Sequence, residues 1–177
     1  MLYTGKGDGG TTKTLGEGQA RISKASELPE ALGSLDELNA FVGYVRTQAK
    51  SEPRIYEALR EVQEKLFIVQ AEVAGADKRL REVDVTAVEE IVNSIEKEIA
   101  PLTGFSVAGG TELSALLDVA RTLSRRAERC VVAVVEAGLR ELQPETRAYM
   151  NRLSSLLFAL ARLANHLAGV AEENPKY

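Results

Sequence analysis

The sequence predicts an all-α protein: a five-helix antiparallel bundle preceded by a glycine-rich N-terminal loop. Five segments carry apolar residues at alternating spacings of three and four, the period of a helix with one buried face. Glycine and proline fall between these segments, and no segment shows a convincing strand pattern. The chain has 177 residues, of which 45% are hydrophobic, enough for one domain with a substantial core.

We expect a single domain over residues 1–177, with a loop at 1–26, a helical bundle at 27–171 and a fraying tail at 172–177. The glycine density of the first segment excludes a helix there, because glycine destabilises helix interiors. We call residues 1–26 the head. Its glycines are Gly5, Gly7, Gly9, Gly10, Gly16 and Gly18.

The first helix is expected to start at Ser34, because Ser34 to Glu37 has the form of a capping box. The second follows Pro53, a residue suited to the first turn of a helix. Both segments then continue with one apolar stripe.

The remaining helices are delimited by similar signals. The third is expected over 84–100 and ends at Pro101. The fourth occupies 111–137 with Gly138 as its stop, and the fifth begins near Pro144. A second loop, 101–110, joins the third and fourth helices.

Composition argues against several classes of protein. The net charge of -4 and the absence of tryptophan disfavour a nucleic-acid-binding protein. No stretch is apolar enough for a signal peptide or a membrane span. Cys130 is the single cysteine, so no internal disulfide forms, and we expect a cytoplasmic protein.

No cluster of ligand side chains predicts a metal held by the protein itself. His166, the single histidine, is interpreted as structural, and Cys130 as a packing or idle residue. No nucleophile with an adjacent base stands out, so any catalysis would depend on positioning and electrostatics.

The head has the chemistry of an anion site. Its glycines let backbone N–H groups converge on one anion, while Lys6 and the threonines add donors suited to phosphate oxygens. The spacing is not that of a Walker loop. The alternative interpretation is an N-terminus without fixed structure.

A row of arginines marks the fourth helix. Arg121, Arg125 and Arg129 recur every four residues, beside the core-facing stripe, and Arg126 points away from them. Guanidinium groups on one ridge repel each other unless anions lie between them, which suggests a polyphosphate ligand at a helix or subunit boundary. The alternative is a solvated basic face. Asn151, at the start of the fifth helix, either binds a ligand through its amide or is an ordinary exposed residue.

Together these segments resemble the PduO-type corrinoid adenosyltransferases. The head from Tyr3 to Thr12, the segment Gly33-Ser34-Leu35-Asp36-Glu37-Leu38-Asn39, Phe105 before Gly109-Gly110, the arginine-rich run 121–129 and Asn151-Arg152-Leu153-Ser154 occur in the family's order. The head departs from the common family pattern at Gly5 and Lys6, and Ala108 replaces a proline common before Gly109.

The resemblance implies an enzyme that transfers the 5′-deoxyadenosyl group of ATP to the cobalt of cob(I)alamin and releases triphosphate. It further implies a homotrimer with ATP at the subunit boundary and Mg²⁺ bound through the ATP phosphates. A reductase and a cobalamin-dependent acceptor enzyme would be transient partners.

The resemblance also assigns roles to residues. The head would hold the triphosphate, the fourth and fifth helices would contact ATP, and an ion pair between Asp36 and Arg121 would position the cobalamin side of the site. Phe105 would occupy the lower face of the corrin and keep the axial ligand off cobalt. The ATP residues implied are Thr4, Gly5, Lys6, Gly7, Thr12, Lys24, Arg125, Glu128, Arg129 and Asn151; those implied in catalysis are Asp36, Phe105, Arg121 and Arg125.

Two other functions remain open at this point. The same bundle could carry cobalamin or ATP without chemistry, or it could be a structural bundle whose arginines form subunit salt bridges. Binding of ATP with Mg²⁺, followed by a test for adenosylation, distinguishes the three.

Overall fold

The computed structural model describes residues 3–15, 20–102 and 104–176. Gly16 and Gly18 of the predicted head lie outside the described residues. The described chain forms helices and two short strands, so the predicted bundle is confirmed. The elements are β1 (Thr11–Lys13), β2 (Arg21–Ser23), α1 (Glu27–Gln48), α2 (Pro53–Ala74), α3 (Glu82–Glu98), α4 (Glu112–Glu136) and α5 (Pro144–Leu167).

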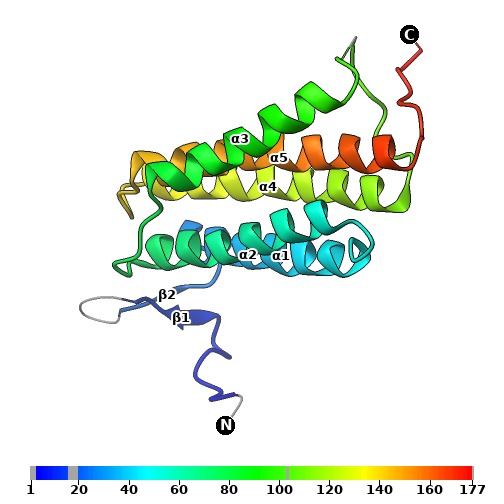
Figure 1. The fold of residues 1–177 in the computed structure, drawn as a ribbon. Helices are drawn as coiled ribbons and strands as arrows, with labels where there is room; N and C mark the ends of the chain where they lie inside the picture. The colour runs from blue at the N-terminus through cyan, green and yellow to red at the C-terminus, as the bar shows by residue number, and fades with distance from the viewer. Residues whose placement is uncertain (1–2, 16–19, 103, 177) are drawn as a thin grey trace.

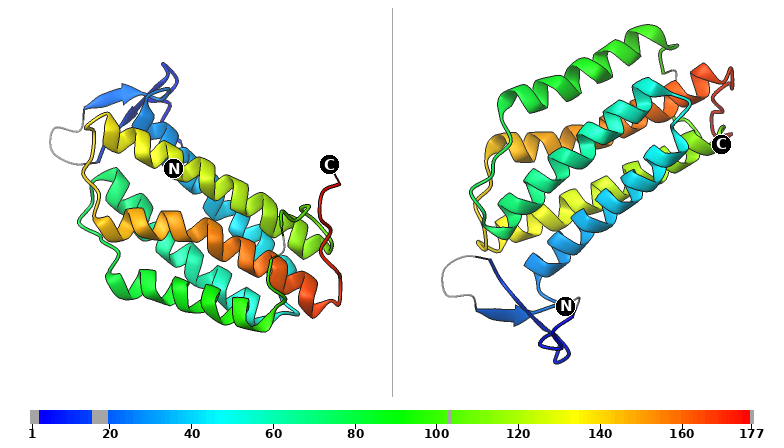
Figure 2. Two further views of the ribbon diagram at one scale, coloured as in Figure 1. Left: turned by 90° about the horizontal axis from the view of Figure 1, so that it is seen from above. Right: turned by 60° about the horizontal axis from the view of Figure 1, so that its bottom comes forward.

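The helices form two layers, with α3, α5 and α4 on one side and α2 and α1 on the other (Figure 1). Consecutive helices alternate in direction, as predicted for an antiparallel bundle. Helix α4 packs against both α5 and α1, and α1 packs against α2. Helix α3 lies along the outer side of α5 and runs in the same direction (Figure 2).

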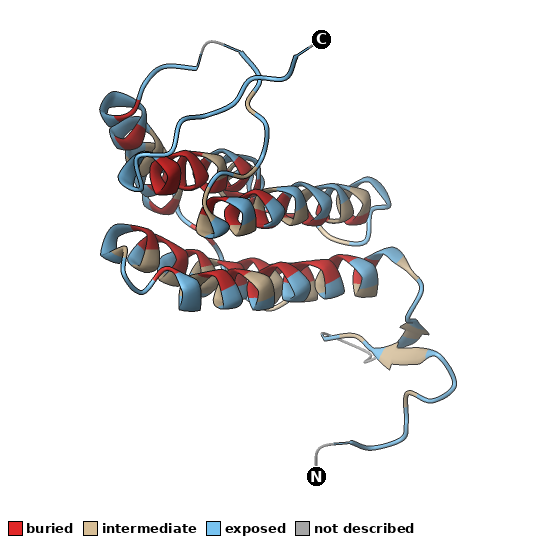
Figure 3. Ribbon diagram, turned by 90° about the vertical axis from the view of Figure 1, so that its right-hand side faces the viewer, coloured by how far each residue is buried: buried red, intermediate tan, exposed pale blue. Residues whose placement is uncertain are grey.

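The core lies between the two layers. Figure 3 shows buried residues on the facing sides of the helices, and exposed or intermediate residues over the head, the loops and the tail. The apolar stripes predicted from helical spacing are the buried ones: Leu35 and Leu38 on α1, Leu59 and Leu66 on α2, and Leu157 on α5 are almost completely inaccessible to solvent.

The predicted start of the first helix was wrong. Helix α1 begins at Glu27 after Ser26, two turns before Ser34. The Ser34 hydroxyl donates to the carbonyl of Ala31 within the helix, at 2.9 Å, so it does not cap an end. Pro29 is accommodated because a first-turn residue needs no N–H partner.

The head also contains strands, which the sequence did not predict. Strands β1 and β2 pair antiparallel, with Thr12 opposite Ile22. The side chain of Arg21 crosses this hairpin: Nε donates to Thr11 Oγ1 at 2.8 Å, and Nη2 donates to the carbonyl oxygens of Thr11 and Lys6. One arginine therefore fastens the glycine turns to the hairpin.

The limits of α4 agree with prediction. Thr111 is its N-cap, and its hydroxyl accepts a hydrogen bond from the N–H of Ser114 at 3.1 Å. Gly138, just beyond the helix, has a φ of 67°, the left-handed conformation that commonly ends helices.

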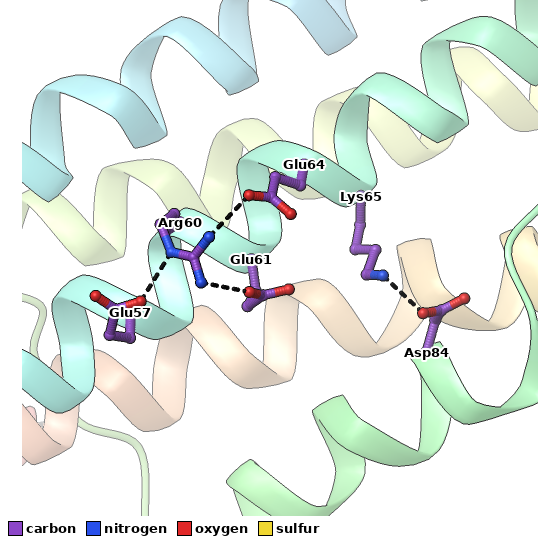
Figure 4. A network of polar contacts seen from close by, with 6 residues as sticks. All are labelled: Glu57, Arg60, Glu61, Glu64, Lys65 and Asp84. Atoms are coloured by element: carbon purple, nitrogen blue, oxygen red, sulfur yellow. Dashed lines mark hydrogen bonds and ion pairs between the residues drawn. The ribbon is translucent and has the colours of Figure 1, made fainter.

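Helix α3 is fastened to α2 by an ion pair. Lys65 Nζ lies 2.7 Å from Asp84 Oδ1, and Asp84 is almost buried (Figure 4). Burial works to raise the pKa of the Asp84 carboxyl, but the bonds donated by Lys65 and by the N–H of Arg81 outweigh it and hold the pKa below the ordinary value of 3.8. The neighbouring contacts of Arg60 with glutamates, by contrast, are exposed.

The tail, which is expected to fray, makes two polar contacts at its start. Glu172 forms an ion pair with Arg162, and the carbonyl of Glu173 accepts a hydrogen bond from the N–H of Val107 at 2.8 Å. Both contacts are made across the end of α5, so the first residues of the tail are part of the packed structure. Among the described residues, none of the helices combines the length and apolar character needed to cross a bilayer.

Candidate active site

A cavity of about 580 Å³ opens between α4, α5 and the 101–110 loop. It brings together Phe105 from the loop with Arg121 and Arg125 from α4, three of the residues implied by the family resemblance. Ser154, Ser155 and Phe158 of α5 complete its wall. A pocket of this volume, lined by two aromatic rings together with arginines and serines, is of the size that holds small molecules.

Arg121 is held firmly at this cavity. Its Nε donates to Asp118 Oδ1 at 2.9 Å, and its guanidinium lies 5.8 Å from the centre of the Phe158 ring. Such stacking over an aromatic face stabilises a cation and fixes its orientation. Arg121 is therefore a preorganised positive charge.

The expected ion pair between Asp36 and Arg121 is not formed within the described chain, where the carboxylate that pairs with Arg121 is Asp118. Asp118 lies one turn before Arg121 on α4, so this contact forms locally. Asp36 is an exposed residue of α1. The pairing of Asp36 with Arg121 stays a prediction for a contact between subunits.

The other arginines differ in their partners. Arg126 pairs with Glu37 of α1, which agrees with its expected direction away from the row. Arg129 donates to the carbonyl of Arg125 at 3.0 Å. Among the described residues, neither Arg125 nor Arg129 has a carboxylate within ion-pair distance, so their charges are available to an anionic ligand.

Glu128 and Asn151 lie together, as their shared assignment to ATP requires. Asn151 Nδ2 donates to Glu128 Oε1 at 3.1 Å, and Asn151 Oδ1 accepts from Arg152 Nη1 at 2.8 Å. Arg152 in turn donates to Glu89 of α3 at 2.9 Å. This chain of contacts fixes which way the Asn151 amide faces and links it to α3.

Phe105 stands out from the loop with 78% of its surface exposed. After Phe105, the loop leads into α4 through Gly110. This glycine has a φ of 102°, and its position leaves no room for a side chain. A Cβ there would lie 2.5 Å from Asn165 Oδ1. Phe105 is therefore an exposed aromatic ring at the mouth of the cavity.

The head residues form a second group. A Cβ placed on Gly7 would lie 3.1 Å from Lys24 Nζ, so Lys24 lies directly against the glycine turns. Turns follow one another there: the N–H of Asp8 donates to Gly5 and that of Gly10 donates to Gly7. The N–H of Lys6 donates to Thr4 Oγ1 at 3.4 Å. The glycine turns and Lys24 therefore lie together, and these three N–H groups are bonded within the head.

The head faces a separate cavity of about 510 Å³, lined by Thr12 and Lys24 with Leu28 at the start of α1 and Ala74 at the end of α2. The 101–110 loop lies at the opposite end of the bundle (Figure 1). The Phe105 cavity itself reaches the middle of α4, because Arg125 is next to Arg126, which pairs with Glu37 of α1; among the described residues it shares no lining residue with the head cavity. One chain therefore does not bring its own head to the Phe105 cavity.

Neither His166 nor Cys130 joins these groups. His166 is exposed beside the tail, and Cys130 is partly buried against the core. No group of three or more His, Cys, Asp or Glu side chains suited to a metal ion occurs within residues 3–15, 20–102 and 104–176.

Comparison with known proteins identifies the family. A family model described as cobalamin adenosyltransferase matches residues 2–164. The chain belongs to the cobalamin adenosyltransferase family. It is 34% identical to the corrinoid adenosyltransferase of Bacillus subtilis, over 97% of this chain and 90% of that protein. It is 36% identical to a corrinoid adenosyltransferase of Citrobacter freundii, over 92% and 93% of the two chains.

Solved structures of the same family match the whole fold. A variant of the PduO-type ATP:corrinoid adenosyltransferase from Lactobacillus reuteri, complexed with cobalamin and ATP, superposes with a TM-score of 0.92 at 29% identity, over 99% of this chain and 97% of that one. Another variant of that enzyme, complexed with ATP, gives 0.91 at 30% identity over 99% and 100% of the two chains. The family resemblance drawn from the sequence motifs is confirmed.

The sequence analysis gave no role to several residues around the Phe105 cavity. Ser154, Ser155 and Phe158 share one face of α5. Phe158 lies four positions after Ser154 and three after Ser155, so the sequence spacing could have predicted that they lie together. The pairing of Asp118 with Arg121 was readable for the same reason. The role of Arg21 was not, because it depends on a hairpin that the sequence did not reveal.

Proposed function

We propose that this cobalamin adenosyltransferase transfers the 5′-deoxyadenosyl group of ATP to the cobalt of cob(I)alamin, forming adenosylcobalamin and triphosphate. The observation that carries the proposal is the cavity that unites Phe105, Arg121 and Arg125. It combines an apolar wall for a corrin with cations for a departing polyphosphate. The relatives' activity supports this assignment.

Charge development explains the need for the arginines. As the cobalt–carbon bond forms, the bond between the ribose 5′ carbon and the triphosphate oxygen breaks, and its electron pair remains on that oxygen. Arg125, which has no carboxylate partner among the described residues, is available to stabilise that charge. A preorganised donor of this kind typically contributes about 3 kcal/mol to the transition state.

The position of Phe105 supports its predicted role. Its exposed ring lines the cavity rather than the core, so a corrin can stack on it without disturbing the bundle. There the ring would exclude an axial ligand from the lower face of cobalt. Exclusion of the axial ligand favours four-coordinate Co(II), which is easier to reduce to the nucleophilic Co(I).

We infer that the complete site contains two copies of the chain. The head, with Lys6 and Lys24, would reach the Arg125 region of a neighbouring subunit, because among the described residues the head cavity and the Phe105 cavity of one chain share no lining residue. Asp36 is exposed on α1 and would meet Arg121 across the same boundary. A homotrimer, as the resemblance implies, closes such a head-to-tail contact into a ring.

The chain supplies donors for phosphate rather than ligands for a metal. Mg²⁺ would be held chiefly by the phosphates and by water, with neutral or anionic oxygens such as those of Thr4, Thr12 and Glu128 nearby. This ion favours phosphate oxygens and retained waters over all-protein cages. Its contribution is to neutralise part of the triphosphate charge. We place the enzyme in the cytoplasm, where a reductase would supply Co(I) and an acceptor enzyme would receive the product.

The direct test mixes the protein with ATP, Mg²⁺ and chemically reduced cobalamin and follows the absorbance change to the alkylated form. Adenosylation supports the proposal. If adenosylation is absent, calorimetry with ATP and Mg²⁺ separates the alternatives. ATP binding without adenosylation identifies a carrier, and no ATP binding identifies a structural bundle.

A further inference from the structure

Side chains of α5 hold both ends of the loop that carries Phe105. Arg162 Nη2 donates to the carbonyl of Ala100 at 2.6 Å, where the loop begins. Asn165 Nδ2 donates to the carbonyl of Gly109 at 2.8 Å, and its Oδ1 accepts from the N–H of Thr111 at 2.9 Å. Both side chains belong to nearly buried residues, with 8% and 7% exposed. Since they lie three positions apart, they share one face of α5.

The tail crosses the same loop and contacts both the loop and α5. Glu172 accepts from Arg162 Nε at 2.5 Å and from Nη2 at 3.1 Å, a bidentate contact. The carbonyl of Glu173, the next residue, accepts from the N–H of Val107 at 2.8 Å. Figure 1 shows the tail beside the segment that leads into α4. The tail therefore holds the middle of the loop, and Arg162 holds the tail.

These polar contacts matter because the loop has little apolar anchoring of its own. The side chains of Leu102, Phe105 and Val107 are exposed rather than packed in the core. A loop without buried apolar residues takes its position from its hydrogen bonds, and a charge-assisted bond to a nearly buried arginine is among the strongest available.

We propose that Arg162 and Glu172 are positioning residues of the adenosyltransferase: the tail is a strap that holds Phe105 at the mouth of the cavity. The inference rests on the proposed function, because the loop matters only where Phe105 meets a corrin. The ATP residues Arg125, Glu128 and Asn151 lie on α4 and α5, away from the strap. Loss of the strap lowers the fraction of molecules with Phe105 in place, which weakens corrinoid binding in proportion and leaves ATP binding unchanged.

The test compares Glu172→Gln with Glu173→Gln. The two residues are adjacent and lose the same charge, but Glu173 holds the loop through its main-chain carbonyl, so its side chain is a matched control. For Glu172→Gln we expect the KM for cob(I)alamin to rise about tenfold, the effect of one lost charge-assisted bond. The KM for ATP and the melting temperature stay at wild-type values, and less of the bound Co(II) cobalamin is four-coordinate. Glu173→Gln matches wild type, and Glu172→Asp, which keeps the charge, recovers part of the loss.

A second readout does not depend on activity. Hydrogen exchange of the segment 104–110 should quicken in Glu172→Gln and not in Glu173→Gln, because the strap protects the Val107 amide. Equal exchange in both variants would overturn the strap. An equal rise in both KM values, or an equal effect of both variants, would overturn the positioning role. A wild-type protein without adenosylation would instead overturn the proposed function, while the exchange result would still decide whether the strap exists.

Discussion

Arg125 and Arg126 are neighbours in sequence with different surroundings. Arg125 lines the cavity and has no carboxylate partner among the described residues, whereas Arg126 pairs with Glu37 at an exposed contact with α1. The first is arranged to meet a ligand charge, and the second joins two helices.

We therefore predict that Arg125→Ala lowers the adenosylation rate about a hundredfold, since one oxyanion donor is worth roughly 3 kcal/mol. Arg126→Ala is the control, because an exposed ion pair contributes at most about 1 kcal/mol to stability and nothing to the cavity. Initial rates with reduced cobalamin, and melting temperatures of both variants, provide the check. Equal rates for the two variants would remove Arg125 from the mechanism.

The candidate site was partly predictable from individual residues. Motif order placed Phe105, Arg121 and Arg125 in one site, and the fold brings them to one cavity. The partner of Arg121 was assigned to Asp36, although Asp118 stood one turn away on the same helix. Within a helix, residues three or four positions apart lie side by side, so their contact can be predicted from sequence spacing. A contact between subunits has no such spacing in the sequence.

At the scale of elements, the start of α5 depends on a carboxylate from another helix. Glu72 of α2 is only 2% exposed and accepts from the N–H of Gln143 at 2.8 Å and from the Thr146 hydroxyl. Gln143 makes no side-chain cap of its own. A negative charge at a helix N-terminus is favourable, and here it also joins α2 to α5.

Glu72→Ala is expected to destabilise the protein by about 3 kcal/mol, because it leaves buried donors without an acceptor. The control Glu64→Ala, on the exposed side of the same helix, should change stability by less than about 0.5 kcal/mol. Urea unfolding of both variants measures the difference. Similar midpoints for the two would show that Glu72 does not cap α5.

The attachment of α3 should depend on pH. Because the folded state holds the pKa of Asp84 below 3.8, its ion pair with Lys65 stabilises the fold above that pH and loses this contribution as the pH falls through the folded-state value. We expect Asp84→Asn to be less stable than wild type at pH 7, with a difference in unfolding free energy that narrows as the pH falls below 3.8. Thermal melts of both proteins across this pH range test the prediction. A difference in stability that does not change with pH would contradict the role given to the ion pair of Asp84 with Lys65.

Helix positions were predictable where the signal was local. Pro53, Thr111, Gly138 and Pro144 mark helix ends through their own backbone chemistry, and the structure places ends there. The start of α1 was missed because Ser34 to Glu37 imitates a capping box inside a helix. The hairpin was missed because its three-residue strands pair across an intervening loop, and so short a run carries no period to detect.

At the scale of the whole molecule, the head lies beside the start of α1, whereas the Phe105 cavity lies between α4, α5 and the loop that joins α3 to α4. Both carry residues that the family resemblance assigns to one ATP molecule. The sequence predicted a site at a boundary, either between helices of one chain or between subunits. It could not distinguish the two, because separation along a chain says little about separation in space. The separation of the two cavities within one chain favours two subunits.

The most direct test of this account mixes two inactive variants, Lys24→Ala and Arg125→Ala, by coexpression and subunit assembly. Each variant alone lacks one half of every site. In a mixed ring, a site with the head of the Arg125→Ala subunit and the α4 of the Lys24→Ala subunit is intact, so about a quarter of the sites should recover adenosylation. If the mixed assemblies form and show no more activity than either variant alone, the head and the arginine row do not meet across subunits, and the proposed site is wrong.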